Sequence, residues 1–210
     1  MKNTSMKDLL RHYKNNLVKK IHIFRNNNFD NFVFVHINKT GGTSVGKALN
    51  LPLSHSTARE KIEIMGRQKW ESRFSFAIVR NPWDKVVSHY HYRVKTKQTN
   101  FGENAIEFKE WVKLSYGNKD PFYYDKPRMF MPQVNWISDR EGKVAVNFIG
   151  RFESLNDDFQ EICKNIGKKA TLPHLKSSKH AHYKDYYDEE TMKIIERCFQ
   201  KDIELFEYKF

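Results

Sequence analysis

The stretch that decides the fold reads FVFVHINKTGGTS and spans residues 32–44. Its apolar first half is rich in β-branched and aromatic residues and predicts a buried strand. The two glycines permit a tight turn whose N–H groups point at one anion, and a helix expected from about Thr43 adds its positive N-terminal end. Lys39 precedes both glycines, whereas the Lys of a Walker A loop follows the last one. The stretch predicts a phosphate-binding strand–turn–helix unit, and a turn that binds nothing is the alternative.

The candidate phosphate ligands in this turn are an ammonium group, hydroxyl groups and backbone N–H groups. They belong to Lys39, Thr40, Gly41, Gly42, Thr43 and Ser44. The Lys supplies a mobile positive charge, and the other residues supply neutral donors.

A second strand-to-helix junction reads FSFAIVRNPWDKVVS and spans residues 74–88. Its apolar run predicts a strand that ends at Arg80, and Asn81 suits the N-cap of the following helix. In open α/β sheets, ligands bind outside the carboxyl ends of the strands. Arg80 can hold a phosphate there bidentately while Ser88 donates a hydroxyl, and a structural ion pair is the alternative for Arg80. Two such junctions favour a nucleotide that carries phosphate at two places.

Both junctions resemble motifs of one enzyme family. The segment HINKTGGTS resembles the 5′-phosphosulfate-binding loop of sulfotransferases that use 3′-phosphoadenosine 5′-phosphosulfate (PAPS), and RNPWDKVVS resembles their 3′-phosphate-binding motif. The chain is most similar to small bacterial members of the carbohydrate-type sulfotransferase family 2. Residues 148–153 and 172–175 extend the resemblance, which covers roughly residues 30–210. Asn38 departs from the family, in which many members have Pro at this place.

The resemblance implies a fold and a domain organisation. We expect an α/β fold with a P-loop-like parallel sheet flanked by helices, in a single sulfotransferase domain at residues 30–210. Residues 1–29 then form a basic N-terminal extension, which we expect to be helical in part.

The resemblance also implies sulfuryl transfer from PAPS to a hydroxyl, in line and without a metal. Lys39 is the expected stabiliser of the leaving group. A His suits the general base, because the ordinary imidazole pKa of about 6.5 is close to working pH. His55 lies between the two motifs, where related carbohydrate sulfotransferases place a catalytic His, and His36 is the next candidate. An idle imidazole at a helix start is the alternative for His55.

Further nucleotide contacts are expected late in the chain. Residues 172–180 have the composition of a loop that closes over the nucleotide, and Lys176, Ser177 and Lys179 could reach the 3′-phosphate. Arg151 follows a strand expected at Val144–Ile149 and either contacts the nucleotide or forms an ion pair with an acid such as Glu153.

The composition fits an enzyme with anionic ligands. The 210 residues carry 37 basic and 25 acidic side chains, a net charge of +12, which favours anionic partners. Nucleic acid is not an expected partner, because the lysines are scattered and no nucleic-acid-binding motif occurs. The expected partners are the nucleotide donor and a carbohydrate or other hydroxyl acceptor.

Two other function classes are a P-loop-type small-molecule kinase and a non-catalytic nucleotide- or polyanion-binding protein. A kinase needs a Walker A Lys and an acid for Mg²⁺, and the sequence contains neither pattern. No stretch approaches the roughly 20 apolar residues of a membrane span, and no signal peptide is evident. We therefore expect a cytoplasmic protein, in which residues 6–25 could form a basic amphipathic helix that packs on the domain or contacts a membrane surface.

The remaining pattern predicts further helices and one long loop. A loop at Gly117–Pro132 is expected either to line the acceptor side or to pack its aromatic residues on the core. The helices are expected at Thr57–Trp70, Ala105–Tyr116 and Leu155–Gly167, with a long final helix capped by Asp188. Cys163 and Cys198 fall in apolar helical stripes and are expected to be reduced, buried thiols.

Overall fold

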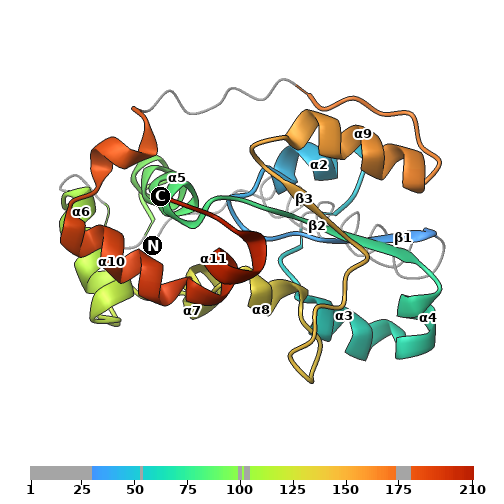
Figure 1. Cartoon of the computed structure of the whole chain (residues 1–210), viewed down its shortest axis with the longest axis horizontal. Helices are drawn as coiled ribbons and strands as arrows, with labels where there is room; N and C mark the ends of the chain where they lie inside the picture. Colours follow the sequence, from blue (N-terminus) through green and yellow to red (C-terminus); the bar gives the residue numbers. More distant parts are fainter. Residues whose placement is uncertain (1–29, 53, 99–100, 102–104, 174–180) are drawn as a thin grey trace, which may run out of the picture.

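Figure 1 shows the computed structural model, which describes residues 30–52, 54–98, 101, 105–173 and 181–210. The strands are β1 (Phe32–Val35), β2 (Phe74–Val79) and β3 (Phe148–Arg151). The helices are α2 (Gly42–Ala48), α3 (Ala58–Met65), α4 (Arg67–Glu71), α5 (Pro82–Lys95), α6 (Phe108–Val112), α7 (Pro127–Phe130), α8 (Val134–Ile137), α9 (Leu155–Asn165), α10 (Glu189–Cys198) and α11 (Gln200–Phe206). A π-helical turn (Lys113–Gly117) and a 3₁₀ turn (Tyr183–Tyr186) complete the set.

The strands form a parallel sheet in the order β1–β2–β3. Because successive side chains of a strand point to opposite faces, each strand contributes to two cores. Phe32 and Phe34 pack with α2 and α9 on one face, and Val33 and Val35 pack with α3 and α8 on the other. Figure 1 shows α2 and α9 above the sheet and α3 and α4 below it. The expected α/β class, a parallel sheet flanked by helices, is confirmed.

A third core lies beyond the carboxyl ends of the strands. It is built by α5, α6 and α10 around Trp111 and Phe199, both fully buried. Figure 1 shows these helices gathered beside the end of the sheet at which β2 runs into α5. The carboxyl ends of the strands therefore face a helical layer rather than open solvent.

Two expected helices are interrupted. The segment Thr57–Trp70 divides into α3 and α4 at Gly66, whose φ of +86° is incompatible with a right-handed helix. The final helix, capped by Asp188 as expected, divides at Phe199, whose φ of −115° turns its side chain into the third core. The helix expected at Ala105–Tyr116 begins later, at Phe108. It is α-helical to Val112 and π-helical from Lys113 to Gly117.

The expected strand at Val144–Ile149 is misplaced. The strand is β3, from Phe148 to Arg151, and Val144 makes only an isolated antiparallel bridge with Ser138. The cause is a turn closed by the Asp139 carboxylate, which accepts from two later N–H groups and folds the chain back before it reaches β2.

Residues 1–29, including the helix expected at 6–25, lie outside the described residues. In the described part of the chain, none of the helices combines the length and the apolar character needed to cross a lipid bilayer. Cys163 is a buried free thiol and Cys198 is a half-buried one.

Candidate functional site

The loop between β1 and α2 is shaped by two glycines that leave no space for a Cβ. A Cβ on Gly41, whose φ is +80°, would lie 2.8 Å from Cδ2 of Leu155. A Cβ on Gly42 would lie 2.0 Å from Cδ2 of His36, so the imidazole fills the space that a side chain would need. Lys39 takes a positive φ of 66°, which is uncommon outside glycine. The loop backbone is therefore held tightly at the carboxyl end of β1.

Two polar side chains stabilise the loop from within. The Oγ1 of Thr40 donates to the Ile37 carbonyl oxygen at 3.0 Å and is fully buried, so its hydroxyl turns into the loop. Asn38, which replaces the Pro of many family members, donates from Nδ2 to the Met129 carbonyl oxygen at 3.0 Å. Asn38 thus connects the loop to α7.

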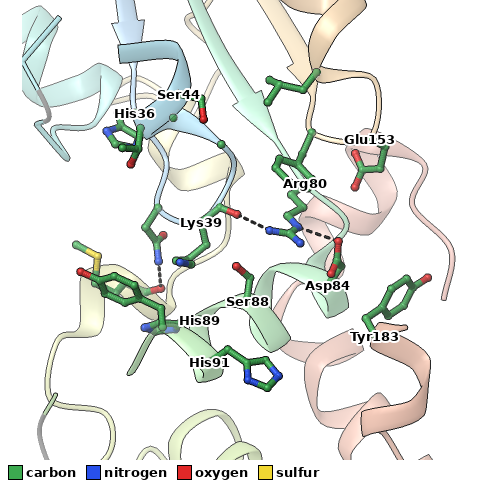
Figure 2. A pocket seen from close by; sticks show the side chains of 18 of the residues that line it. His36, Lys39, Ser44, Arg80, Asp84, Ser88, His89, His91, Glu153 and Tyr183 are labelled. Atoms are coloured by element: carbon green, nitrogen blue, oxygen red, sulfur yellow. Dashed lines mark hydrogen bonds and ion pairs between the residues drawn. The ribbon is translucent and has the colours of Figure 1, made fainter. Parts of the chain in front are cut away.

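The second junction places Arg80 directly after β2, as expected. Nε of Arg80 lies 2.8 Å from Oδ2 of Asp84, and Nη1 donates to the Lys39 carbonyl oxygen at 3.1 Å (Figure 2). The guanidinium also lies 4.0 Å from the centre of the Phe152 ring. Arg80 therefore makes the ion pair considered above, and at the same time it links the two loops.

The main chain after Arg80 is held from the end of the chain. The Asn81 N–H donates to Oε1 of Glu153 at 2.6 Å, and the same carboxylate accepts from the Tyr208 hydroxyl. Nδ2 of Asn81 donates to the Lys209 carbonyl oxygen, while its Oδ1 caps α5.

The Lys39 ammonium faces cationic neighbours. It lies 4.3 Å from the centre of the Tyr92 ring on α5. Burial, followed by the positive charges of Arg80 and Lys95, lowers the Lys39 pKa to about 8. Figure 2 shows Ser88 pointing from α5 into the space between Lys39 and Asp84. An anion in this space would relieve the repulsion among these cations.

The two candidate bases, His36 and His55, lie against each other with ring centres 4.3 Å apart. Nδ1 of His55 lies 3.0 Å from the His36 carbonyl oxygen, and because a carbonyl only accepts, this nitrogen carries the proton. The Nε2 of a neutral His55 then keeps its lone pair. His36 is buried between Phe34 and His55, and burial, reinforced by the charges of His55 and Lys61, lowers its pKa to about 3. The geometry favours His55 over His36 as a base.

These side chains surround a cavity of ≈ 1450 Å³. The expected site residues that line it are Lys39, Gly41, Gly42, Thr43, Ser44, His55, Arg80 and Ser88. Thr40 and Arg151 are not among the lining residues. The Arg151 guanidinium donates to the Phe206 carbonyl oxygen at 2.7 Å and lies over the Tyr208 ring. The expected contacts at Lys176, Ser177 and Lys179 fall outside the described residues.

The segment Gly117–Pro132, expected as a loop, includes α7 and contributes both to the cavity and to a core. Lys126 and Met129 line the cavity, whereas Phe130 lies in the third core with Tyr123 and Tyr124 packed against it.

Sequence reasoning missed Tyr92, Phe152 and Glu153 as neighbours of the two loops that were predicted to bind phosphate. Each contacts Lys39, Arg80 or Asn81 from a separate segment, and no local motif marks such a contact. Within the described residues, no group of three or more His, Cys, Asp or Glu side chains is arranged to hold a metal.

Comparison with known proteins gives one family match, one relative and two solved structures to report. The sulfotransferase family model matches residues 22–209. An uncharacterised protein of Archaeoglobus fulgidus is 34% identical over 106 residues, which are 49% of this chain and 75% of that protein. Among solved structures, a sulfotransferase from Alicyclobacillus acidocaldarius has a TM-score of 0.47 at 12% identity, with coverage of 86% of this chain and 97% of that one. Mouse sulfotransferase SULT7A1 complexed with PAP has a TM-score of 0.46 at 14% identity, with coverage of 88% of each chain.

Proposed function

Because the chain belongs to the sulfotransferase family, we propose that it transfers a sulfuryl group from PAPS to a hydroxyl of a carbohydrate acceptor. The observation that carries the proposal is the meeting of two phosphate-type loops at one cavity, joined by the hydrogen bond from Arg80 to the Lys39 carbonyl oxygen. A donor with phosphate at both the 3′ and the 5′ position matches two such loops.

The donor fits the residues that are present. In our proposal the 5′-phosphosulfate meets the Lys39 ammonium, the backbone of Gly41 and Gly42, and the first turn of α2, where N–H groups lack helical acceptors. The 3′-phosphate meets Arg80 and the Ser88 hydroxyl. The Nε of Arg80 is taken by Asp84, so the phosphate approaches the edge formed by the two terminal nitrogens.

The chemistry follows from the orientation of His55. Its Nε2 accepts the proton of the acceptor hydroxyl while that oxygen attacks sulfur in line. The bond between sulfur and the bridging oxygen breaks, and adenosine 3′,5′-bisphosphate leaves with the bonding electrons. The Lys39 ammonium and the loop N–H groups stabilise the charge that develops on the bridging oxygen. The cavity exceeds the roughly 300–1,000 Å³ typical of single small-molecule sites, which leaves room for an acceptor beside the donor.

The experiment that tests the donor is a pair of calorimetric titrations with adenosine 3′,5′-bisphosphate and with AMP. We expect the bisphosphate to bind far more tightly, because a charged contact made only by the 3′-phosphate is worth roughly 2–5 kcal/mol. Equal affinities would contradict the proposal, and tight binding of ATP that depends on Mg²⁺ would favour a kinase.

The acceptor is tested by incubating the protein with labelled PAPS and fractionated host glycans. Mass spectrometry should then find a sulfate ester on a sugar hydroxyl. If label is released only as free sulfate in every fraction, the proposal of a carbohydrate acceptor is wrong.

A further inference from the structure

A buried amide holds the main chain at Arg80. Oε1 of Gln133 accepts from the Arg80 N–H at 2.9 Å, and Nε2 of Gln133 donates to the Arg80 carbonyl oxygen at 2.8 Å. Gln133 is fully buried and precedes α8, 53 residues away in the sequence. One side chain thus satisfies both backbone groups of Arg80, the residue that follows β2.

Gln133 is itself held from α11. One oxygen of the Asp202 carboxylate accepts from the Gln133 N–H at 2.7 Å, and the other accepts from the Val134 N–H at 2.8 Å. Asp202 and Lys85 are both fully buried. Burial raises the Asp202 pKa, and the N–H groups of Val134 and Gln133 and the positive charge of Lys85 oppose this rise. A continuous set of hydrogen bonds therefore runs from α11 through Gln133 to Arg80.

This network acts on the residue that links the two loops. The guanidinium of Arg80 is oriented by Asp84 and by the Lys39 carbonyl oxygen, but these contacts depend on where the Arg80 backbone lies. An Arg fixed before its ligand arrives loses little freedom on binding, and a misplacement of about 1 Å weakens a directional contact strongly. Gln133 lies outside the cavity lining and cannot contribute by touching the ligand.

We propose that Gln133, held by Asp202, is a positioning residue that sets the Arg80 guanidinium for the 3′-phosphate of the donor. The proposal rests on the donor assigned above. It extends the phosphate site to two residues that no local motif marks, on segments far from both loops in the sequence.

The test uses Gln133→Glu in the full chain. At pH 8 an ionised carboxylate can accept from the Arg80 N–H but places a second acceptor against the Arg80 carbonyl oxygen. We expect the ratio of bisphosphate to AMP affinity to fall about tenfold, the size of one charged hydrogen bond, while AMP affinity stays near that of the wild type. At about pH 5.5 a buried carboxyl is protonated and can donate as the amide does, so the ratio should approach the wild-type ratio at that pH.

The matched control is Asn147→Ala, a residue just before β3 whose side chain contacts Ser75 near the amino end of β2. Oδ1 of Asn147 accepts from the Ser75 N–H and hydroxyl at 2.8 Å, so its loss also disturbs β2. We expect the control to lower the melting temperature with no change in the affinity ratio. A wild-type ratio in Gln133→Glu at pH 8 overturns the inference, as does a loss at pH 8 that lowering the pH does not restore.

If Gln133→Glu does not fold, Asp202→Asn carries the test, because its amide oxygen can satisfy only one of the two N–H groups. We expect the ratio of bisphosphate to AMP affinity to fall, but by less than in Gln133→Glu. An unchanged ratio overturns the inference. A wild-type protein that does not distinguish the bisphosphate from AMP contradicts the proposed donor instead.

Discussion

At the β1–α2 junction the helix N-cap is Gly41, which has no side chain to accept hydrogen bonds, whereas at the β2–α5 junction Oδ1 of Asn81 accepts from the first N–H groups of α5. The Ser44 N–H donates to the Gly41 carbonyl oxygen, so among the described residues it is the earlier N–H groups of α2 that remain for a ligand, whereas Oδ1 of Asn81 already uses those of α5. The first junction is suited to bind an anion with its backbone. In our proposal the second binds one with side chains, which are those of Arg80 and Ser88.

The two junctions also differ in what shapes them. The first needs residues without a Cβ, because Leu155 and His36 fill the spaces that side chains at positions 41 and 42 would occupy. The second needs hydrogen-bond partners, because side chains from distant segments hold the backbone at Arg80 and Asn81. Substitutions that add atoms should damage the first junction, and substitutions that remove partners should damage the second.

The largest effect should come from His55→Ala beside the first junction. Loss of a general base lowers turnover by roughly 10²–10⁴. Bisphosphate affinity should stay normal, because the change removes no proposed nucleotide contact. Steady-state rates together with nucleotide titration test this. Near-normal turnover would show that a group other than His55 is the general base.

Lys39→Ala should follow, with turnover reduced by about 10²–10³ as for other preorganised electrostatic groups. Donor affinity should fall less, because the backbone of the first junction still binds. If KM for the donor rises while kcat is unchanged, Lys39 only binds and does not act in the transition state.

At the second junction, Arg80→Lys should lower the preference for bisphosphate over AMP by roughly tenfold or more. Lys keeps the charge but cannot contact Asp84, the Lys39 carbonyl oxygen and a phosphate together. Titration with both nucleotides checks this. An unchanged preference for the bisphosphate would show that Arg80 has only a structural role.

The pH dependence of kcat/KM should report on Lys39 at the first junction. Burial and nearby cations lower the Lys39 pKa to about 8, so the ammonium form is complete below pH 7 and is lost as the pH rises through 8. The value of kcat/KM should then fall about tenfold per pH unit above this range. In Lys39→Arg the residual activity should lack this decline, because the guanidinium stays charged; a decline that persists belongs to another group.

The smallest effect should be that of Gly42→Ala on stability. The new Cβ meets the His36 ring, and such overpacking costs about 1–3 kcal/mol. Addition of His36→Ala should restore part of the loss. Gly117→Ala is the matched control, because its Cβ meets Ile194 only at 3.5 Å, an ordinary contact. Urea unfolding of the wild type, Gly42→Ala, His36→Ala and the double variant measures this coupling, with Gly117→Ala unfolded beside them.

The sequence predicted the parts of the site that depend on neighbouring residues. The strand before Lys39, the position of Arg80 and the Asn81 cap follow from local patterns, and the structure agrees with all three. The inward turn of the Thr40 hydroxyl was not foreseen, because it depends on the Ile37 carbonyl rather than on residue type.

The remaining contacts come from distant segments. Gln133 and Glu153 reach the second junction from 53 and 72 residues away, and a lone Gln or Glu in a sequence gives no sign of such a partner. The strand at Val144–Ile149 was misplaced for a different, local reason. The Asp139 carboxylate accepts from the Glu141 and Lys143 N–H groups, and Val144 pairs with Ser138 before the chain reaches β2, which residue type alone does not show.

The contact between Asn81 and Lys209 spans 128 residues, and it matters for how the protein is made on the ribosome. Domains are synthesised from the N-terminus, and contacts between distant segments close slowly. The first junction needs residues up to Leu155, but the second waits for Asp202 and the residues after it. A nascent chain that has β1, α2 and β2 already paired would therefore still lack the hydrogen bonds that hold Arg80, and we expect it to bind the proposed nucleotide only after the last helix has been translated.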